Sequence, residues 1–260
     1  FDENLGLNDV QATRVDLDHL VTAPFRVGFV KFAPFAGLRY TYYDQGRITD
    51  DDRHRVGFTW GARAAAEFSR TFDVSGGLFG LDGLRHIILP EIEYRRVQHV
   101  SRDQEDFVQL AAVDAFTERE ELVFGLRNRL QTFWEINGER QVVNFFDLDL
   151  EWTLFPNADR DNFGETLGNL DFDLLWRLSP QILYVLDFEY SFRLDTMEVF
   201  NTTLGWEVNQ DRFLGLGYRR FVDVNDVILG IARWRVDERL GLIATSGYDF
   251  VEDRAQDPRL

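Results

Sequence analysis

The chain contains no cysteine, a single methionine and a single lysine, Lys31, among its 260 residues. Without cysteine, neither a disulfide framework nor a thiolate metal site can form. The formal net charge is −17, which argues against a nucleic-acid partner because such a partner requires a basic surface. Long apolar runs are absent too, and no stretch approaches the roughly 20 residues of a membrane-spanning helix.

Motifs typical of enzyme active sites are also missing. No serine stands in a G-x-S-x-G context, and no glycine-rich loop follows an expected strand and opens a helix. The histidines lack the spacing of metal ligands: His19, His54, His86 and His99. Acid pairs such as Asp147 and Asp149 resemble the carboxylates of a glycosidase, but they point the same way along a strand and recur on three strands. We therefore expect neither catalysis nor a cofactor.

The chain is instead rich in alternation between apolar and polar residues. In one segment Phe146, Leu148, Leu150, Trp152 and Leu154 are interleaved with Asp147, Asp149, Glu151 and Thr153. Successive side chains of a strand point to opposite faces, so this segment has one apolar and one acidic face. Similar segments recur from Arg14 onward, and none of the repeats of 20–50 residues that mark propellers is present.

This alternation predicts about twelve strands, many of them longer than the usual five or six residues. They are expected at 13–21, 27–43, 55–72, 84–97, 121–134, 141–154, 167–178, 181–193, 198–208, 212–221, 226–236 and 239–251. Residues 1–12 form an irregular lead-in, and residues 13–260 form a single domain. A tilted strand needs roughly 9–11 residues to cross a bilayer, a length that these segments reach.

The connections between the expected strands alternate in length. Short ones fall at 22–24, 135–139, 179–180, 209–210 and 237–238, whereas several of the intervening ones are long, at 44–54, 98–120 and 156–165. Short turns on one side and long loops on the other are typical of outer-membrane barrels. The glycine-rich segment 73–83 is a long connection on the short side and breaks this rule. Within 98–120 the spacing of apolar residues suggests a short helix.

Aromatic residues stand at the ends of the apolar faces, as in the girdles of membrane barrels. The six tryptophans are Trp60, Trp134, Trp152, Trp176, Trp206 and Trp234. The sequence therefore predicts an all-β, antiparallel up-and-down transmembrane β-barrel of about twelve long strands, forming part of a larger barrel. Because its first and last strands are then unpaired at the edges, we expect residues 1–260 to form a curved, incompletely closed sheet.

Three segments, in order and separation, resemble strands of the LptD family of lipopolysaccharide-assembly outer-membrane proteins. They are residues 34–44 (PFAGLRYTYYD), residues 83–95 (GLRHIILPEIEYR) and residues 124–131 (FGLRNRLQ). The positions that match the family's motifs are Tyr42, Tyr43, Asp44, Arg85, His86, Pro90 and Tyr94. The resemblance extends over about residues 14–250 and is most specific between residues 30 and 135.

The resemblance implies a barrel in the outer membrane of a Gram-negative cell that releases lipopolysaccharide into the outer leaflet. It also implies a plug lipoprotein and periplasmic bridge proteins as partners, besides lipopolysaccharide and outer-membrane lipid. The chain departs from the family in lacking the N-terminal jelly roll, enough strands for the full barrel and the cysteines that some members carry. Disulfide-controlled maturation is therefore not expected.

Arginines on the polar faces are candidates for substrate contact. Guanidinium groups grip phosphate through paired donors, so these side chains are expected to meet lipid A phosphates or inner sugars: Arg39, Arg63, Arg85, Arg127 and Arg129. The alternative is cross-strand pairing with acids inside a wet barrel. His86 falls on the apolar register of its strand, which favours a packing role.

Two further alternatives remain open from the sequence. The acidic run Asp50-Asp51-Asp52 is either a solvated loop or a site for a divalent cation that bridges lipopolysaccharide heads. The whole chain is alternatively a general diffusion porin or adhesin-type barrel, or a soluble all-β binding protein with its polar face in water. A membrane barrel requires detergent for extraction, whereas a soluble protein stays in buffer.

Overall fold

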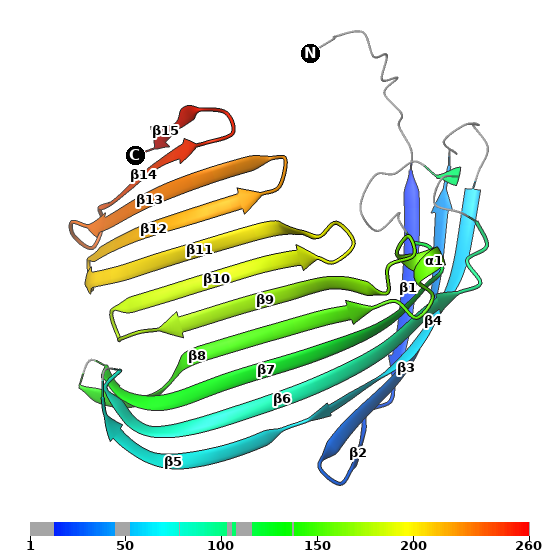
Figure 1. Ribbon diagram of the computed structural model, residues 1–260, viewed down its shortest axis with the longest axis horizontal. Coiled ribbons are helices and arrows are strands. Elements are labelled where there is room, and N and C mark those ends of the chain that lie inside the picture. The colour runs from blue at the N-terminus through cyan, green and yellow to red at the C-terminus, as the bar shows by residue number, and fades with distance from the viewer. Residues whose placement is uncertain are drawn as a thin grey trace.

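The computed structural model describes residues 13–44, 53–77, 79–102, 106–107, 116–136 and 138–259, with side chains described up to residue 253. The predicted all-β, antiparallel up-and-down architecture is confirmed. One sheet of 15 strands runs in the order β1-β3-β4-β6-β7-β8-β9-β10-β11-β12-β13-β14-β15, with β2 beside β3 and β5 beside β6. The sheet is long and curved, with β1 and β15 at its two edges (Figure 1).

The strands are as follows: β1 (Arg14–Thr22), β2 (Phe25–Val27), β3 (Val30–Tyr43), β4 (Arg53–Ala66), β5 (Phe68–Gly76), β6 (Leu81–Gln98), β7 (Arg119–Ile136), β8 (Glu139–Leu154), β9 (Leu167–Arg177), β10 (Ile182–Ser191), β11 (Thr196–Asn209), β12 (Arg212–Phe221), β13 (Asn225–Arg235), β14 (Gly241–Asp249) and β15 (Arg254–Arg259). Among the described residues there is one short α-helix, α1 (Ala158–Asp161), in the connection from β8 to β9. Each of the twelve expected strands has a counterpart, and β15 was not expected. Among the described residues, no helix is long and apolar enough to cross a membrane.

The predicted turn at 22–24 is wrong. Thr22 pairs with Phe35 and Phe25 pairs with Phe32 in the same register, so β1 and β2 follow one line interrupted at Pro24. Proline has no N–H to donate to the ladder, so it interrupts the pairing without reversing the chain. The reversal lies between Val27 and Val30, where Gly28 has a φ of 60°.

Strands β4 and β5 likewise follow one line, in agreement with the single strand expected at 55–72. Ala65 pairs with Glu91 of β6 and Phe68 pairs with Ile88 in an unchanged register. The break between them lies opposite Pro90, whose pairing with Leu126 of β7 is continuous. The missing N–H of Pro90 therefore falls on the side of β4 and β5, which explains why the strand is interrupted there.

Successive connections alternate between two sides of the sheet, here named the turn side and the loop side. The turn side has only short connections among the described strands, whereas the loop side has the long ones and also short ones at 192–195, 222–224 and 250–253. The turn side includes the connection from β5 to β6, which spans only residues 77–80. The long connection expected at 73–83 is therefore wrong, and the turn side has a short connection here as well. Glycines with positive φ, among them Gly76 and Gly80, let both strands continue close to a tight reversal. The loop side carries the connections at 44–52, 99–118 and 155–166.

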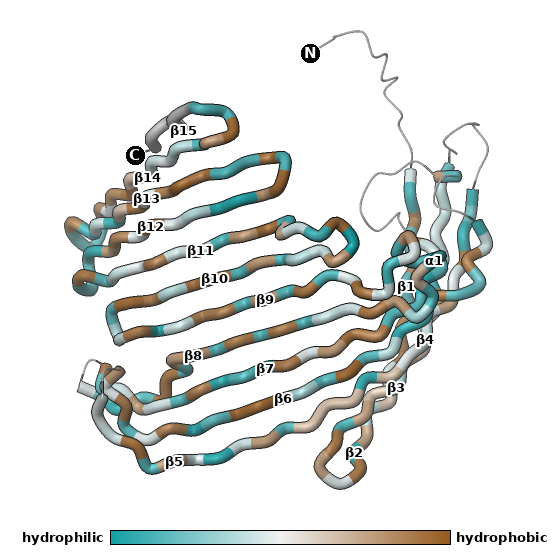
Figure 2. The backbone as a smooth tube through the Cα atoms, viewed as in Figure 1, coloured by the Kyte–Doolittle hydropathy of each residue, from teal (hydrophilic) through white to brown (hydrophobic). Residues whose placement is uncertain are grey.

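Polar and apolar residues alternate along much of the sheet, as in the second half of β8 and the middle of β9, so these strands have one polar and one apolar face (Figure 2). Register places Asp149 opposite Arg127 and Asp173 on the polar face, and Leu148 opposite Leu174 on the apolar face. Few side chains are fully buried, and many large apolar ones are exposed, including Leu204, Leu216 and Leu242. The described pairings include none between β1 and β14 or β15, so the sheet is open within the described residues, as expected.

Candidate lumen and lipid-facing belts

Four of the five predicted arginines are held by carboxylates on the polar face. Arg39 donates to Asp16 through two nitrogens, Arg127 Nε lies 2.7 Å from Asp149 Oδ1, and Arg129 Nε lies 2.9 Å from Asp147 Oδ2. These contacts match the alternative in which arginines pair with acids across strands. Arg127 and Arg129 stand directly opposite their acids in the register, whereas Arg39 reaches diagonally past Asp18 to Asp16 on the same face.

The fourth pair is part of a larger cluster around Glu93. The Glu93 carboxylate is almost buried and accepts hydrogen bonds from Arg63 Nε at 2.8 Å and from Arg95 Nη2 at 2.6 Å. Arg63 also lies 3.3 Å from Glu91. One buried carboxylate thus holds two guanidinium groups that are each about half exposed, at 50% and 47%.

Arg85 differs from the other four arginines. It lies on the polar face opposite Thr71 of β5 and Gln131 of β7, and neither neighbour carries a charge. Within the part of the chain that the structure describes, no carboxylate forms an ion pair with it. Arg85 lines a hollow of about 240 Å³ together with Gly83, Gln131 and Phe133. It is therefore the predicted arginine best placed to take an anionic ligand.

Carboxylates form two rows across β8, β9 and β10. Asp173 pairs directly with Asp149 on one side and Asp187 on the other, and Asp171 stands in the same way between Glu151 and Glu189. Like charges directly opposite each other are unfavourable in a sheet. The acid pairs that resembled a glycosidase are thus part of a continuous acidic surface.

Two residues of the connection from β6 to β7, Phe107 and Phe116, pack against the polar face near the loop side, a contact that the sequence did not predict. Arg55 of β4 is only 1% exposed, and its guanidinium lies 4.8 Å from the Phe107 ring and 5.6 Å from the Phe116 ring. Its Nη1 donates to the Phe116 carbonyl at 3.0 Å, and Tyr43 packs on Phe107 with ring centroids 4.9 Å apart. The expected helix falls largely on residues outside the described ones. No local pattern around Arg55 signals these contacts, because they join residues about 50 to 60 positions apart.

The first group of family-motif positions lies at the loop-side end of β3. Tyr42 is on the apolar face opposite Val15 and His54, whereas Tyr43 is buried on the polar face. Asp44 accepts a hydrogen bond from the Thr13 backbone N–H at 2.7 Å, which lowers the pKa of its carboxyl below the usual value.

The second group lies along β6. His86 is on the apolar face, as expected, and its Nε2 is 2.7 Å from Asn128 Oδ1. Tyr94, on the same face, donates from its hydroxyl to Glu120 at 2.8 Å and packs against Trp60 with ring centroids 5.5 Å apart. Pro90 interrupts the neighbouring ladder, as described above. These motif positions therefore have structural roles, and Arg85 alone presents an uncommitted charge.

Aromatic residues of the apolar face form two belts. The turn-side belt contains Trp176, Trp206 and Trp234, and the loop-side belt contains Trp60, Tyr94, Trp152, Tyr190, Tyr218 and Tyr248. Trp134 is an exception, because it is only 5% exposed and lies beyond the belt near the turn from β7 to β8. Trp134 therefore lies near a strand end, as expected, but belongs to neither belt.

The turn-side belt advances steadily from strand to strand. Trp176 is in line with Leu204 through Tyr184, and Trp206 stands two residues nearer the turn. Trp206 is in line with Ala232 through Leu214, and Trp234 again stands two residues nearer the turn. The belt thus shifts by one residue per strand. A shift of about 3.3 Å along the strand for each 4.8 Å across means that the strands are tilted by about 35° from the perpendicular to the belt.

Comparison with known proteins does not add a family. No protein-family model matches the chain, and no curated protein matches it. Among the described residues, no group of three or more histidine, aspartate or glutamate side chains is arranged to hold a metal ion. The predicted cation site at Asp50-Asp52 lies outside the described residues.

Proposed function

We propose that the chain forms a wall of an outer-membrane β-barrel, with its apolar face in lipid and its polar face lining a wet lumen. The observation that carries this proposal is the stagger of the tryptophan belt. Membrane barrels tilt their strands by about 35–45°, and a belt parallel to the bilayer then crosses each strand one residue later. The apolar face of a soluble sandwich would be covered by a second sheet, yet Trp206 and Trp234 are 47% and 49% exposed.

We further propose that the barrel handles lipopolysaccharide as a component of an LptD-like assembly machine. The support is the resemblance of three segments, which lie on β3, β6 and β7 within one half of the sheet. The polar face would accommodate phosphates and sugars, while acyl chains would remain at the apolar side. No bond is made or broken in this role. Plug lipoprotein and periplasmic bridge proteins are the partners that the resemblance adds.

Arg85 provides the sharpest test, because its neighbour His86 faces the other way. A photo-crosslinking amino acid at position 85 should capture lipopolysaccharide in Gram-negative cells, whereas the same group at 86 should capture bulk phospholipid. Position 127 serves as a control on the polar face. In the parent chain Asp149 neutralises Arg127, so we expect less lipopolysaccharide near this position and fewer adducts with a crosslinker placed there. Phospholipid adducts at 86 without lipopolysaccharide at 85 would retain the membrane barrel and reject lipopolysaccharide as its cargo.

One observation favours a second candidate, the diffusion porin. Phe107 and Phe116, both in the connection from β6 to β7, pack on the polar face and would narrow a lumen there. A porin would conduct ions through planar bilayers, and replacement of Arg55 would change its conductance. Steady conductance together with the absence of lipopolysaccharide adducts at 85 would favour this candidate.

A further inference from the structure

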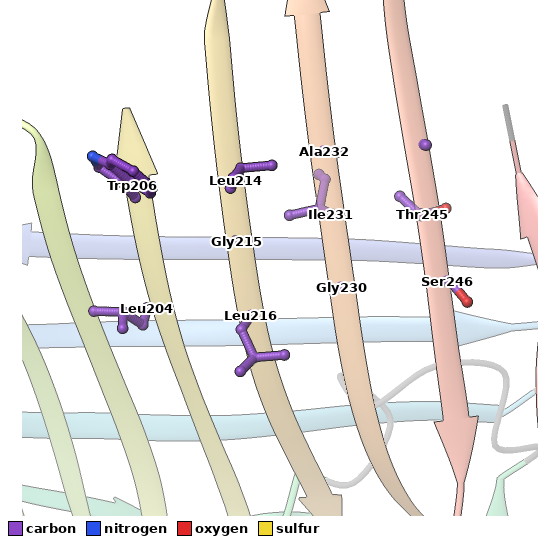
Figure 3. A pocket seen from close by; sticks show the side chains of 11 residues that line it. Leu204, Trp206, Leu214, Gly215, Leu216, Gly230, Ile231, Ala232, Thr245 and Ser246 are labelled. Carbon is purple, nitrogen blue, oxygen red and sulfur yellow. The ribbon is translucent and has the colours of Figure 1, made fainter. Parts of the chain in front are cut away.

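The apolar face carries a hollow across β11, β12, β13 and β14 (Figure 3). Its volume is about 510 Å³. Large side chains bound it on β11 and β12, namely Leu204, Trp206, Leu214 and Leu216. It lies directly beside the turn-side belt, because Trp206 belongs to both.

The hollow exists because four neighbouring positions of the apolar face hold small residues. Gly230 and Ala232 of β13 pair with Ser246 and Ala244 of β14, and all four face the same way as Leu214 and Leu216. Equivalent rows on β8, β9 and β10 hold leucine and phenylalanine, for example Leu148, Leu174 and Phe188. The small residues of β13 and β14 lie beside the large side chains of β11 and β12, and this difference in size leaves a trough in the surface of the sheet. Elsewhere on the apolar face large side chains fill the corresponding space.

A cation stands at the turn-side end of this hollow. Arg212 is two residues from Leu214 on β12 and pairs with Trp234, so it shares the apolar face. Its guanidinium lies 4.9 Å from the Trp234 ring, and Arg212 is exposed. The described residues include no carboxylate in an ion pair with Arg212. An exposed cation on an aromatic ring beside an apolar trough complements a molecule that has an anionic head and an apolar tail.

We propose that this hollow seats an acyl chain of a glycerophospholipid whose phosphate meets Arg212. The inference rests on the proposed membrane insertion, and it adds a specific lipid site to it. Short turns of outer-membrane barrels face the periplasm, so the turn-side leaflet is the one that supplies phospholipid. The site would hold one lipid against β12–β14 while lipid elsewhere on the apolar face exchanges freely.

The test uses the complete chain folded into phosphatidylcholine vesicles that contain a few per cent of phosphatidylglycerol with a photoactivatable acyl chain. Crosslinks mapped by mass spectrometry should concentrate on Leu214, Ala232 and Ala244 relative to Leu148 and Leu174. A single cationic contact at the membrane surface should favour the anionic probe over the matching phosphatidylcholine probe by about fivefold. Arg212→Gln should abolish that preference, and Ala232→Leu should fill the trough and reduce crosslinking there several-fold.

Two matched controls lie on the apolar face of the other half of the sheet. Ala62→Leu on β4 enlarges a small exposed residue, and Arg70→Gln on β5 removes another arginine that lies over an aromatic ring, 5.1 Å from Phe72. Neither should alter crosslinking in the hollow. If Ala232→Leu fails to fold, Ala244→Leu makes the same test from β14.

The outcomes separate this proposal from the proposed membrane insertion. Equal crosslinking of Leu148, Leu174 and the hollow, unchanged by Arg212→Gln, would overturn the lipid site and leave insertion standing. Absence of lipid crosslinks along the whole apolar face would overturn both. Crosslinking in the hollow that declines as the protein-to-lipid ratio rises would assign it to a second copy of the chain and overturn the lipid site.

Discussion

The polar face differs between the two halves of the sheet. In β1–β8 the arginines Arg39, Arg63, Arg127 and Arg129 each meet a carboxylate of a neighbouring strand. In β9 and β10 the acids Asp171, Asp173, Asp187 and Glu189 lie in rows, and the described residues give none of them an ion pair. The first half pairs these arginines with acids, whereas β9 and β10, called the acidic half below, retain a negative surface that water or mobile cations must offset. The same substitution should therefore have opposite effects in the two halves.

The largest effect is expected from an arginine on the apolar face of β9, compared with one on its polar face. Leu174→Arg puts a charge among apolar side chains and should destabilise the folded barrel by about 2–4 kcal/mol in bilayers. Asp173→Arg, one residue away, faces Asp149 and Asp187 and should cost far less or stabilise. Urea titration in vesicles measures both. Equal costs would mean that the two faces are wrongly assigned, because a shift of one residue exchanges them.

In the ion-paired half, loss of a central acid should be costly. Glu93→Gln leaves Arg63 and Arg95 without their shared carboxylate and should destabilise the fold by about 2 kcal/mol, the value of hydrogen bonds to charged groups. Glu91→Gln is the matched control, since Glu91 is more exposed and makes only the 3.3 Å contact with Arg63. Its cost should stay below about 1 kcal/mol. Similar costs for both variants would show that burial of Glu93 contributes little.

In the acidic half, loss of an acid should be favourable. Asp171→Asn removes a charge that stands between Glu151 and Glu189, and it should stabilise the fold by about 0.5 kcal/mol. The gain should shrink as salt is added, because screening weakens the same repulsion. Unfolding midpoints at low and high ionic strength measure this dependence. A loss of stability would instead mean that the Asp171 carboxylate makes a favourable contact that outweighs the repulsion from Glu151 and Glu189.

Much of the fold follows from alternation, because one-sided burial forces a period of two on every strand. The polar and apolar assignments of Asp149, Leu148 and His86 were accessible in this way. The ion pairs were predicted only as a class, since the partner of Arg127 depends on the register, which turns and bulges set. Pro24 illustrates the problem: proline signals a turn, yet here it interrupts a strand and Gly28 turns the chain.

The rest of the candidate site depends on residues distant in sequence. The contacts of Arg55 with Phe107 and Phe116 arise only when a loop folds back on β4. The small residues Gly230 and Ala232 look unremarkable along the chain, and they form a hollow only beside the leucines of β12 and the alanine of β14. Such features need the strands placed side by side, which periodicity alone does not supply.

The smallest effect concerns an acid in the turn from β13 to β14 that is held by backbone N–H groups. Asp237 accepts hydrogen bonds from the backbone N–H groups of Arg239 at 2.7 Å and Leu240 at 2.8 Å, and these hold the pKa of its carboxyl below the usual value. A group with a lowered pKa in the folded state adds stability above its unfolded pKa of about 3.9, and this contribution is lost as the pH falls through the folded value. Asp237→Asn should therefore unfold earlier in urea than the parent chain at pH 7, and the difference should fade in strong acid. Glu238→Gln, next in the chain, should show no difference at either pH. A deficit of Asp237→Asn that persists unchanged in acid would mean that the turn depends on the shape of the side chain and not on its charge.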